Sequence, residues 1–154
     1  EILGRGRTSR LYRDLVRDQK IAAASQAFNG FPGSKYPTML LVYAVPTQGK
    51  DAMEVGPEVR KHVERLKEEL VSEQELAQVK SRAKADLVRR LASAQGLTFS
   101  LGFTQSLTGD WRDIFRDVER IDKITPEDVQ RVAREYLQAR NRTVGMIVSD
   151  DAAL

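Results

Sequence analysis

One apolar run of strand length, TMLLVYAV at residues 38–45, constrains the fold of this chain more than any other feature. Turn-forming residues bound it, because Gly30 and Pro32 precede the run and Pro46 ends it. An unbroken apolar segment of this length is typical of a strand that is covered on both faces. We therefore expect a central strand here, in a fold that combines strands with helices.

Helical patterns fill most of the remaining sequence. Asp51 is placed to cap a first amphipathic helix, and Ser72 with Glu75 forms an S-x-x-E capping box at the start of a second. We expect further helices over 93–109, around 111–121 and from Thr125-Pro126 onward. The segment RTVGMIV at residues 142–148 is expected to form a final strand.

The segment that follows Thr8 begins as a helix, and the first of two interpretations of it comes from helix propensity. Thr8 and Ser9 can cap a helix that carries Leu11 and Leu15 on one face. Because alanine is the best helix former, propensity alone extends this helix to Ala27.

Positive charge is concentrated at the start of the chain. The first 20 residues hold six basic and three acidic side chains, whereas the rest of the chain carries 19 of each sign. A nucleic-acid-binding domain usually spreads its basic face over several elements. Here Asp14 and Asp18 interrupt the arginines at helical spacing, which indicates a solvated helix face. We therefore expect no nucleic-acid partner, and no apolar run is long enough to predict a membrane span.

Catalytic and metal-binding patterns are weak in this sequence. Its single histidine, His62, could share an ion with Glu58 or Glu69, but a catalytic zinc site needs more good ligands than these. We expect His62 to be a surface or boundary residue of a packing helix. The chain has no cysteine, no serine in a G-x-S-x-G pattern, and no phosphate-loop spacing in GRGRTS. The sequence alone thus predicts no catalytic residue and no metal ligand.

The order of the motifs resembles one protein family. LGRGRTSRLYRDLVRDQKIAAAS, the apolar run, LVSEQELAQVKSRAKADLVRRL, IDKITPEDVQRVAREYL and NRTVGMIV follow one another as in the second, non-metal-binding domain of M16 zinc peptidases, the pitrilysin and mitochondrial processing peptidase family. The resemblance runs from Leu3 to Val148. It implies an α+β fold, with a mixed, largely antiparallel sheet packed against several helices.

The resemblance also decides between the two interpretations of the early segment. It implies that the helix from Ser9 stops near Lys20 and that Ile21–Phe28 is a strand. We adopt this reading, because alanine is only mildly unfavourable in a strand and tertiary context can override that preference.

Family members carry an H-x-x-E-H zinc motif in a first domain, and KHVER in this chain is not that motif. The resemblance therefore implies a non-catalytic domain that walls the substrate chamber and helps to hold extended peptides. It implies zinc in the parent or partner domain, and two kinds of partner: a metal-binding M16 domain in the same or a partner chain, and peptide substrates. The alternative is a structural or scaffolding relative without proteolytic activity, and an upstream H-x-x-E-H helix would discriminate between the two.

In this family the second domain often presents an arginine and a tyrosine, seven residues apart, to the substrate near the zinc. The resemblance aligns these positions with Val16 and Ala23. Shifting the alignment by one residue gives Arg17 and Ala24, which still supplies no tyrosine. We therefore take Val16 and Ala23 as the candidate substrate-binding positions and expect the arginine–tyrosine pair itself to be missing.

The first residues have the pattern of a helix end, because Glu1-Ile2-Leu3 is followed by a glycine at the C′ position. We expect residues 1–154 to form a single M16 C-terminal-type domain that is truncated at its N-terminus and lacks its first elements. Losing a strand leaves an edge of unpaired backbone groups. We therefore expect this fragment, when it is alone, to be either self-associated or poorly soluble.

Overall fold

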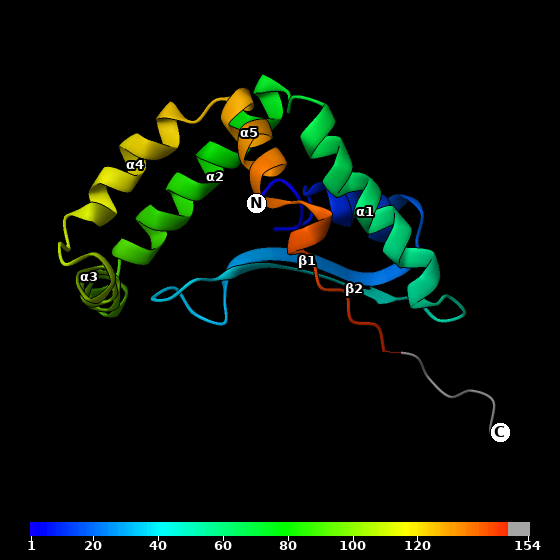
Figure 1. The fold of residues 1–154 in the computed structure, drawn as a ribbon. Helices are drawn as coiled ribbons and strands as arrows, with labels where there is room; N and C mark the ends of the chain where they lie inside the picture. Colours follow the sequence, from blue (N-terminus) through cyan, green and yellow to red (C-terminus); the bar gives the residue numbers. More distant parts are fainter. Residues whose placement is uncertain (148–154) are drawn as a thin grey trace.

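The computed structural model describes residues 1–147 and places helices on one side of an antiparallel hairpin (Figure 1). The hairpin consists of β1 (Ala22–Phe31) and β2 (Met39–Pro46). The helical elements are η1 (Tyr12–Asp18, a π-helix), α1 (Ala52–Glu68), α2 (Glu73–Leu91), α3 (Ala94–Thr108), α4 (Asp113–Lys123), α5 (Pro126–Tyr136) and η2 (Ala139–Asn141, a short 3₁₀ turn). The predicted α+β class, an antiparallel sheet packed against several helices, is confirmed.

The hydrophobic core lies where η1, α1 and α5 meet the hairpin. Leu11 and Leu15 are its most deeply buried side chains, and both are completely inaccessible to solvent. The start of α2 and the first residues of the chain also contribute to this core. Its remaining buried members are Leu3, Ala22, Ala27, Val55, Leu66, Val71, Leu76 and Ala133.

The alanine-rich segment forms strand β1, as the family resemblance implies, and the helix that propensity extends to Ala27 is wrong. A close backbone contact explains the outcome. The Ala27 amide donates a hydrogen bond to the Gly4 carbonyl at 3.1 Å. A Cβ at Gly4 would lie closer to the Ala27 nitrogen than van der Waals contact allows. Small residues on both sides therefore let the first turn dock directly on the strand, and this tertiary contact outweighs the helix propensity of alanine.

Strand β2 is formed as predicted, but the expectation that it is central and covered on both faces is wrong for the described residues. Val42 and Ala44 pack on the core, whereas Tyr43 and Val45 stay substantially exposed. The described sheet contains only β1 and β2, so the far edge of β2 has no partner strand there. An apolar run can thus occupy an edge strand whose outer face is also apolar.

The expected final strand at residues 142–148 is also wrong over 142–147. These residues join neither strand of the hairpin and are exposed throughout. Val148 lies outside the described residues. β-propensity in this segment is insufficient by itself, because a strand exists only where a neighbouring strand completes its hydrogen bonds.

The helix starts follow the predicted capping pattern. The side chains of Asp51, Ser72, Ser93 and Thr125 each accept a hydrogen bond from the backbone N–H three residues later. Gly109 ends α3 in the left-handed conformation. These local signals place α1, α2, α3 and α5 where the sequence predicts them.

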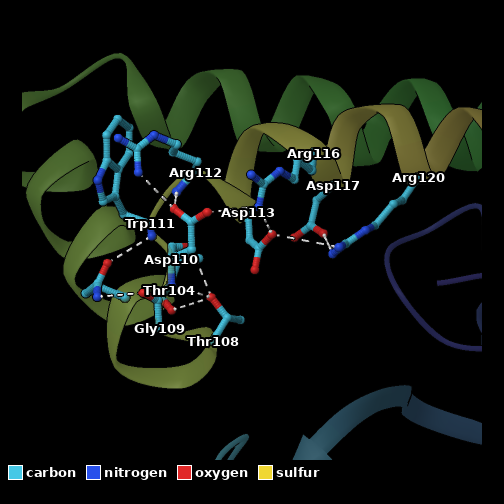
Figure 2. Close-up of polar contacts among 11 residues, drawn as sticks. Thr104, Thr108, Gly109, Asp110, Trp111, Arg112, Asp113, Arg116, Asp117 and Arg120 are labelled. Atoms are coloured by element: carbon cyan, nitrogen blue, oxygen red, sulfur yellow. Dashed lines mark hydrogen bonds and ion pairs between the residues drawn. The ribbon is translucent and has the colours of Figure 1, made fainter.

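We use "helical arm" for α3, α4 and the second half of α2, which lie to the left of α1 and α5 in the view of Figure 1. No residue of α3 is buried, and Ile114 is the buried residue of α4. Polar contacts join the α3–α4 turn to the first turns of α4 (Figure 2). There Asp110 accepts hydrogen bonds from the Arg112 amide and the Arg116 guanidinium, and Arg116 also contacts Asp113.

Candidate functional site

The junction between η1 and β1 has an irregular backbone. All seven residues of η1 are π-helical, and Lys20, which follows the helix, has a positive φ of 55°. The strand register then shifts between Ala22 and Ala24, so Ala23 forms a β-bulge without a directly paired residue on β2. π-helical segments and bulges recur at functional sites because they re-aim side chains. This junction is therefore our candidate site.

Both predicted substrate-binding positions lie in this junction. Val16 belongs to η1, where it is half-buried and packs against the core. Ala23 is exposed at the bulge. Each position thus presents an aliphatic group where the family pattern has a polar side chain. Their contact with a substrate stays a prediction.

A buried histidine ties the junction to α1. His62 is only 6% exposed, and its Nε2 lies 2.6 Å from Oδ2 of Asp14 in η1. Close by, the Gln19 side chain donates a hydrogen bond to Glu58 of α1 at 3.2 Å. Burial would by itself raise the pKa of Asp14, but hydrogen bonds from Gln19 and His62 outweigh it and lower that pKa below its ordinary value.

The prediction that His62 is a surface or boundary residue is therefore wrong. Sequence reasoning missed the contact because Asp14 lies 48 positions away and no local pattern links the two residues. The polar partner of His62 is Asp14, whereas Glu58 accepts a hydrogen bond from Gln19 and Glu69 pairs with Arg65. Within residues 1–147, no three histidine, cysteine, aspartate or glutamate side chains lie close enough to hold a metal ion. One imidazole with one carboxylate does not fit a zinc centre.

A second buried contact joins the N-terminal arginines to α2. Nε and Nη2 of Arg10 donate hydrogen bonds to the two carboxylate oxygens of Glu75, at 2.9 and 2.7 Å. These hydrogen bonds lower the pKa of Glu75. Glu75 is therefore not the second arm of the predicted capping box, of which only the Ser72 hydrogen bond forms.

The prediction of a solvated arginine face is correct for some arginines and wrong for one. Arg17 is exposed and pairs with its neighbour Asp18, and Arg13 is also exposed. The Arg10 side chain, in contrast, is only 11% exposed and its Nη1 is buried without a hydrogen-bond partner. The i, i+4 pattern did not reveal this, because the partner of Arg10 lies 65 positions away.

These features define a class of domain: an α+β unit with helices on one face of a hairpin and an irregular helix–strand junction. Residues 1–83 match the protein family described as the peptidase M16 inactive domain. No curated protein sequence matches the chain. None of the helices within residues 1–147 combines the length and the apolar composition that crossing a bilayer requires.

Solved structures of similar fold extend the comparison to the whole chain. The inactive peptidase domain of a protein assigned as a zinc protease from Bordetella parapertussis is 27% identical with a TM-score of 0.84, over 99% of this chain and 81% of that one. A protein assigned as a zinc protease from Bordetella pertussis Tohama I is 27% identical with a TM-score of 0.81, over 96% of this chain and 79% of that one.

A protease from Helicobacter pylori has the same fold, with a TM-score of 0.78 at 22% identity over 89% of this chain. The present chain spans only 32% of that protease. The chain belongs to the M16 peptidase family, among its inactive domains. The family resemblance of the motif order is thereby confirmed.

Proposed function

We propose that this chain is the non-catalytic domain of an M16-type zinc metalloendopeptidase, where it walls the substrate chamber and helps to hold extended peptides. The observation that carries the proposal is the match of residues 1–83 to the inactive peptidase domain. The likeness of 99% of the chain to the inactive domain from Bordetella parapertussis supports it.

The proposed partner is a metal-binding M16 domain, in the same or another chain, and zinc belongs to that domain. Zinc there would activate a water molecule for attack on the peptide bond. The groups of this chain serve a different purpose. His62 is engaged with Asp14 inside the domain, so it anchors η1 to α1 and stabilises the junction next to Ala23.

We propose that the surface around Ala23 faces the chamber. An exposed bulge offers backbone groups and a small side chain to a passing peptide, without a charge that would fix its position. With Val16 and Ala23 in place of the arginine–tyrosine pair, this domain holds a peptide by shape and backbone contact. Orientation of the scissile bond is then left to the partner domain.

The test uses the full-length protein assembled with its zinc-binding M16 domain, and the unfolded protein β-casein as substrate. We expect the larger side chain in Ala23→Trp to obstruct peptide binding at the chamber wall. It should lower kcat/KM about tenfold, mainly by raising KM. Ala85→Trp, at an exposed position of α2, is the matched control and is expected to leave kcat/KM unchanged. An unchanged kcat/KM in Ala23→Trp would contradict the chamber assignment. An assembly that cleaves nothing, with or without added zinc, would instead favour the scaffolding alternative.

A further inference from the structure

Two elements at the candidate site each contain one residue more than their regular counterparts. A π-helix closes its hydrogen bonds over five residues where an α-helix uses four, and at the end of η1 the Gln19 amide donates to the Asp14 carbonyl at 2.8 Å. Further along the chain, the bulge at Ala23 adds an unpaired residue to β1. The Ile21 carbonyl accepts a hydrogen bond from the Thr47 amide at 3.0 Å, so the end of η1 is tied to the hairpin. A shift of η1 to the α-helical register would therefore displace the residues that lead into the bulge.

The same hydrogen bond places Asp14 and Gln19 on adjacent turns of one face of the helix. In an α-helix, residues five positions apart point about 140° away from each other, since each turn takes about 3.6 residues. In a π-helix, the hydrogen bond between positions i and i+5 brings these two residues close together instead. Asp14 and Gln19 can therefore face one neighbouring element together only in the π-helical register.

Helix α1 is that neighbouring element, and it contacts both residues. Nε2 of His62 lies 2.6 Å from Oδ2 of Asp14, and Glu58 accepts a hydrogen bond from the Gln19 side chain at 3.2 Å. Glu58 and His62 are one helical turn apart, which places them on one face of α1. The His62 side chain is 7% exposed and its Nδ1 is buried without a hydrogen-bond partner among the described residues, so Asp14 is the polar group that holds the ring. We call Glu58 and His62 the α1 clamp.

We propose that the α1 clamp selects the π-helical register of η1 and thereby sets the position of the Ala23 bulge toward a bound peptide. The proposal rests on the proposed peptide-holding function and adds two positioning residues to it, because the clamp acts on the peptide only through Asp14 and Gln19. Long π-helical segments are rare, so the one over Tyr12–Asp18 needs contacts from outside the helix. Loss of the clamp alters the surface that holds the peptide and leaves the zinc chemistry of the partner domain unchanged. Its effect should therefore appear in KM rather than in kcat.

The test uses the full-length protein assembled with its zinc-binding M16 domain, with β-casein as substrate and amide hydrogen exchange as a second measurement. His62→Leu removes the donor to Asp14 and keeps an apolar side chain of similar size, whereas His62→Gln retains an N–H donor. In His62→Leu, we expect exchange over residues 14–23 to accelerate at least about tenfold relative to exchange in α5. We also expect KM to rise about fivefold with kcat unchanged. His62→Gln should reverse most of both effects.

Leu87→Ala is the matched control for a general loss of stability. It removes a buried side chain of α2 that belongs to neither η1 nor α1. We expect it to lower the free energy of unfolding and to leave both the exchange ratio and KM unchanged. Gln19→Ala removes the second tether at an exposed position, so it tests the clamp even if His62→Leu does not fold. It is expected to raise KM about twofold, and a KM equal to that of the unmodified protein would overturn the proposal.

The outcomes separate the two proposals. If the exchange ratio stays unchanged in His62→Leu, the clamp does not hold the junction and this inference fails. If the junction opens but KM stays unchanged, while Ala23→Trp does lower kcat/KM, the clamp does not position the bulge for the peptide. This inference then fails and the chamber role stands. If neither His62→Leu nor Ala23→Trp changes kcat/KM, the peptide-holding function fails, and the clamp is a structural contact only.

Discussion

The core layer and the helical arm of this domain are held together by different physical means. In the core layer, η1, α1 and α5 bury leucines and valines against the hairpin, and the polar contacts His62–Asp14 and Arg10–Glu75 are themselves largely buried. In the helical arm, α3 contains no charged residue and buries none of its side chains. The comparison teaches that the core layer depends mainly on packing, whereas the arm buries two side chains, Leu87 and Ile114, and depends more on caps and ion pairs.

The largest expected effect sharpens this comparison with one substitution in each region. Gly4→Ala places a methyl group against the backbone of Ala27, so we expect a loss of about 4 kcal/mol in the free energy of unfolding. Gly102→Ala, within α3, meets no atom within 4 Å and should stabilise by about 0.5–1 kcal/mol. Urea denaturation measures both. Equal and small effects would show that the first turn does not dock on β1.

Next in size is a pair of large-to-small substitutions. Leu15→Ala removes a fully buried side chain, and we expect it to cost about 3 kcal/mol. Phe99→Ala removes a side chain that is 71% exposed, and we expect a change below about 0.5 kcal/mol. Thermal unfolding followed by circular dichroism compares them. A cost for Phe99→Ala that matches Leu15→Ala would break the distinction between core layer and arm.

Breaking the Arg10–Glu75 pair should have an intermediate effect. Arg10→Met leaves the Glu75 carboxylate partly buried without its bidentate partner, and we expect a cost of about 2 kcal/mol. The double variant Arg10→Met/Glu75→Leu removes both charges and should recover most of that loss. Chemical denaturation of the two variants provides the measurement. Failure of the double variant to recover would point to lost packing of the arginine stem instead.

The pH dependence of stability should come largely from the core layer. The folded-state pKa values of Asp14 and Glu75 are lowered, so their contributions are complete above the ordinary carboxyl range and are lost as the pH falls through the folded-state values. We therefore expect the free energy of unfolding to decline below about pH 4.5. Glu75→Gln should flatten part of that decline when denaturation curves are compared from pH 7 to pH 3. If the free energy of unfolding declined equally with pH in the variant and the unmodified protein, Glu75 would not contribute to the pH dependence.

The smallest effect is expected for the ion pairs of the arm. Arg116→Ala removes contacts to Asp110 and Asp113 at 2.9 and 2.7 Å (Figure 2), but the Arg116 side chain is 52% exposed, whereas Arg10 in the buried pair is 11% exposed. We expect a cost below about 1 kcal/mol, reduced further at high salt. Unfolding at low and high ionic strength measures it. A large cost that does not depend on salt would mean that the Arg116 contacts contribute as much to stability as the buried Arg10–Glu75 pair.

Local signals in the sequence predicted much of this fold, and long-range contacts account for what they missed. Asp51, Ser72, Ser93 and Thr125 mark helix starts correctly, because a cap interacts with its own first turn. The strand character of the alanine segment followed from family resemblance and not from propensity, since it depends on docking of Gly4.

The substrate-binding role of the candidate site stays a prediction, and local sequence signals did not indicate its backbone geometry. Val16 and Ala23 were placed by resemblance, but the π-helix between Tyr12 and Asp18 and the bulge at Ala23 have no sequence signature that we recognised. The contacts of His62 and Arg10 were missed because their partners lie on other elements, 48 and 65 positions away. The prediction that the apolar run in β2 is covered on both faces was wrong. Hydrophobic periodicity alone cannot distinguish a strand that is buried on both faces from an apolar strand with one exposed face.

The contact between α1 and α5 has a consequence for the order of folding. Gln130 and Arg134 of α5 donate hydrogen bonds to the carbonyls of Glu68 and Lys67 at the end of α1. The first of these contacts closes a loop across 62 positions of the chain. Closing a flexible loop of that length carries an entropic cost, and early helix formation in the arm shortens the path that remains flexible. We therefore expect that an arm formed early makes closure of the α1–α5 contact faster than a disordered connection of the same length would.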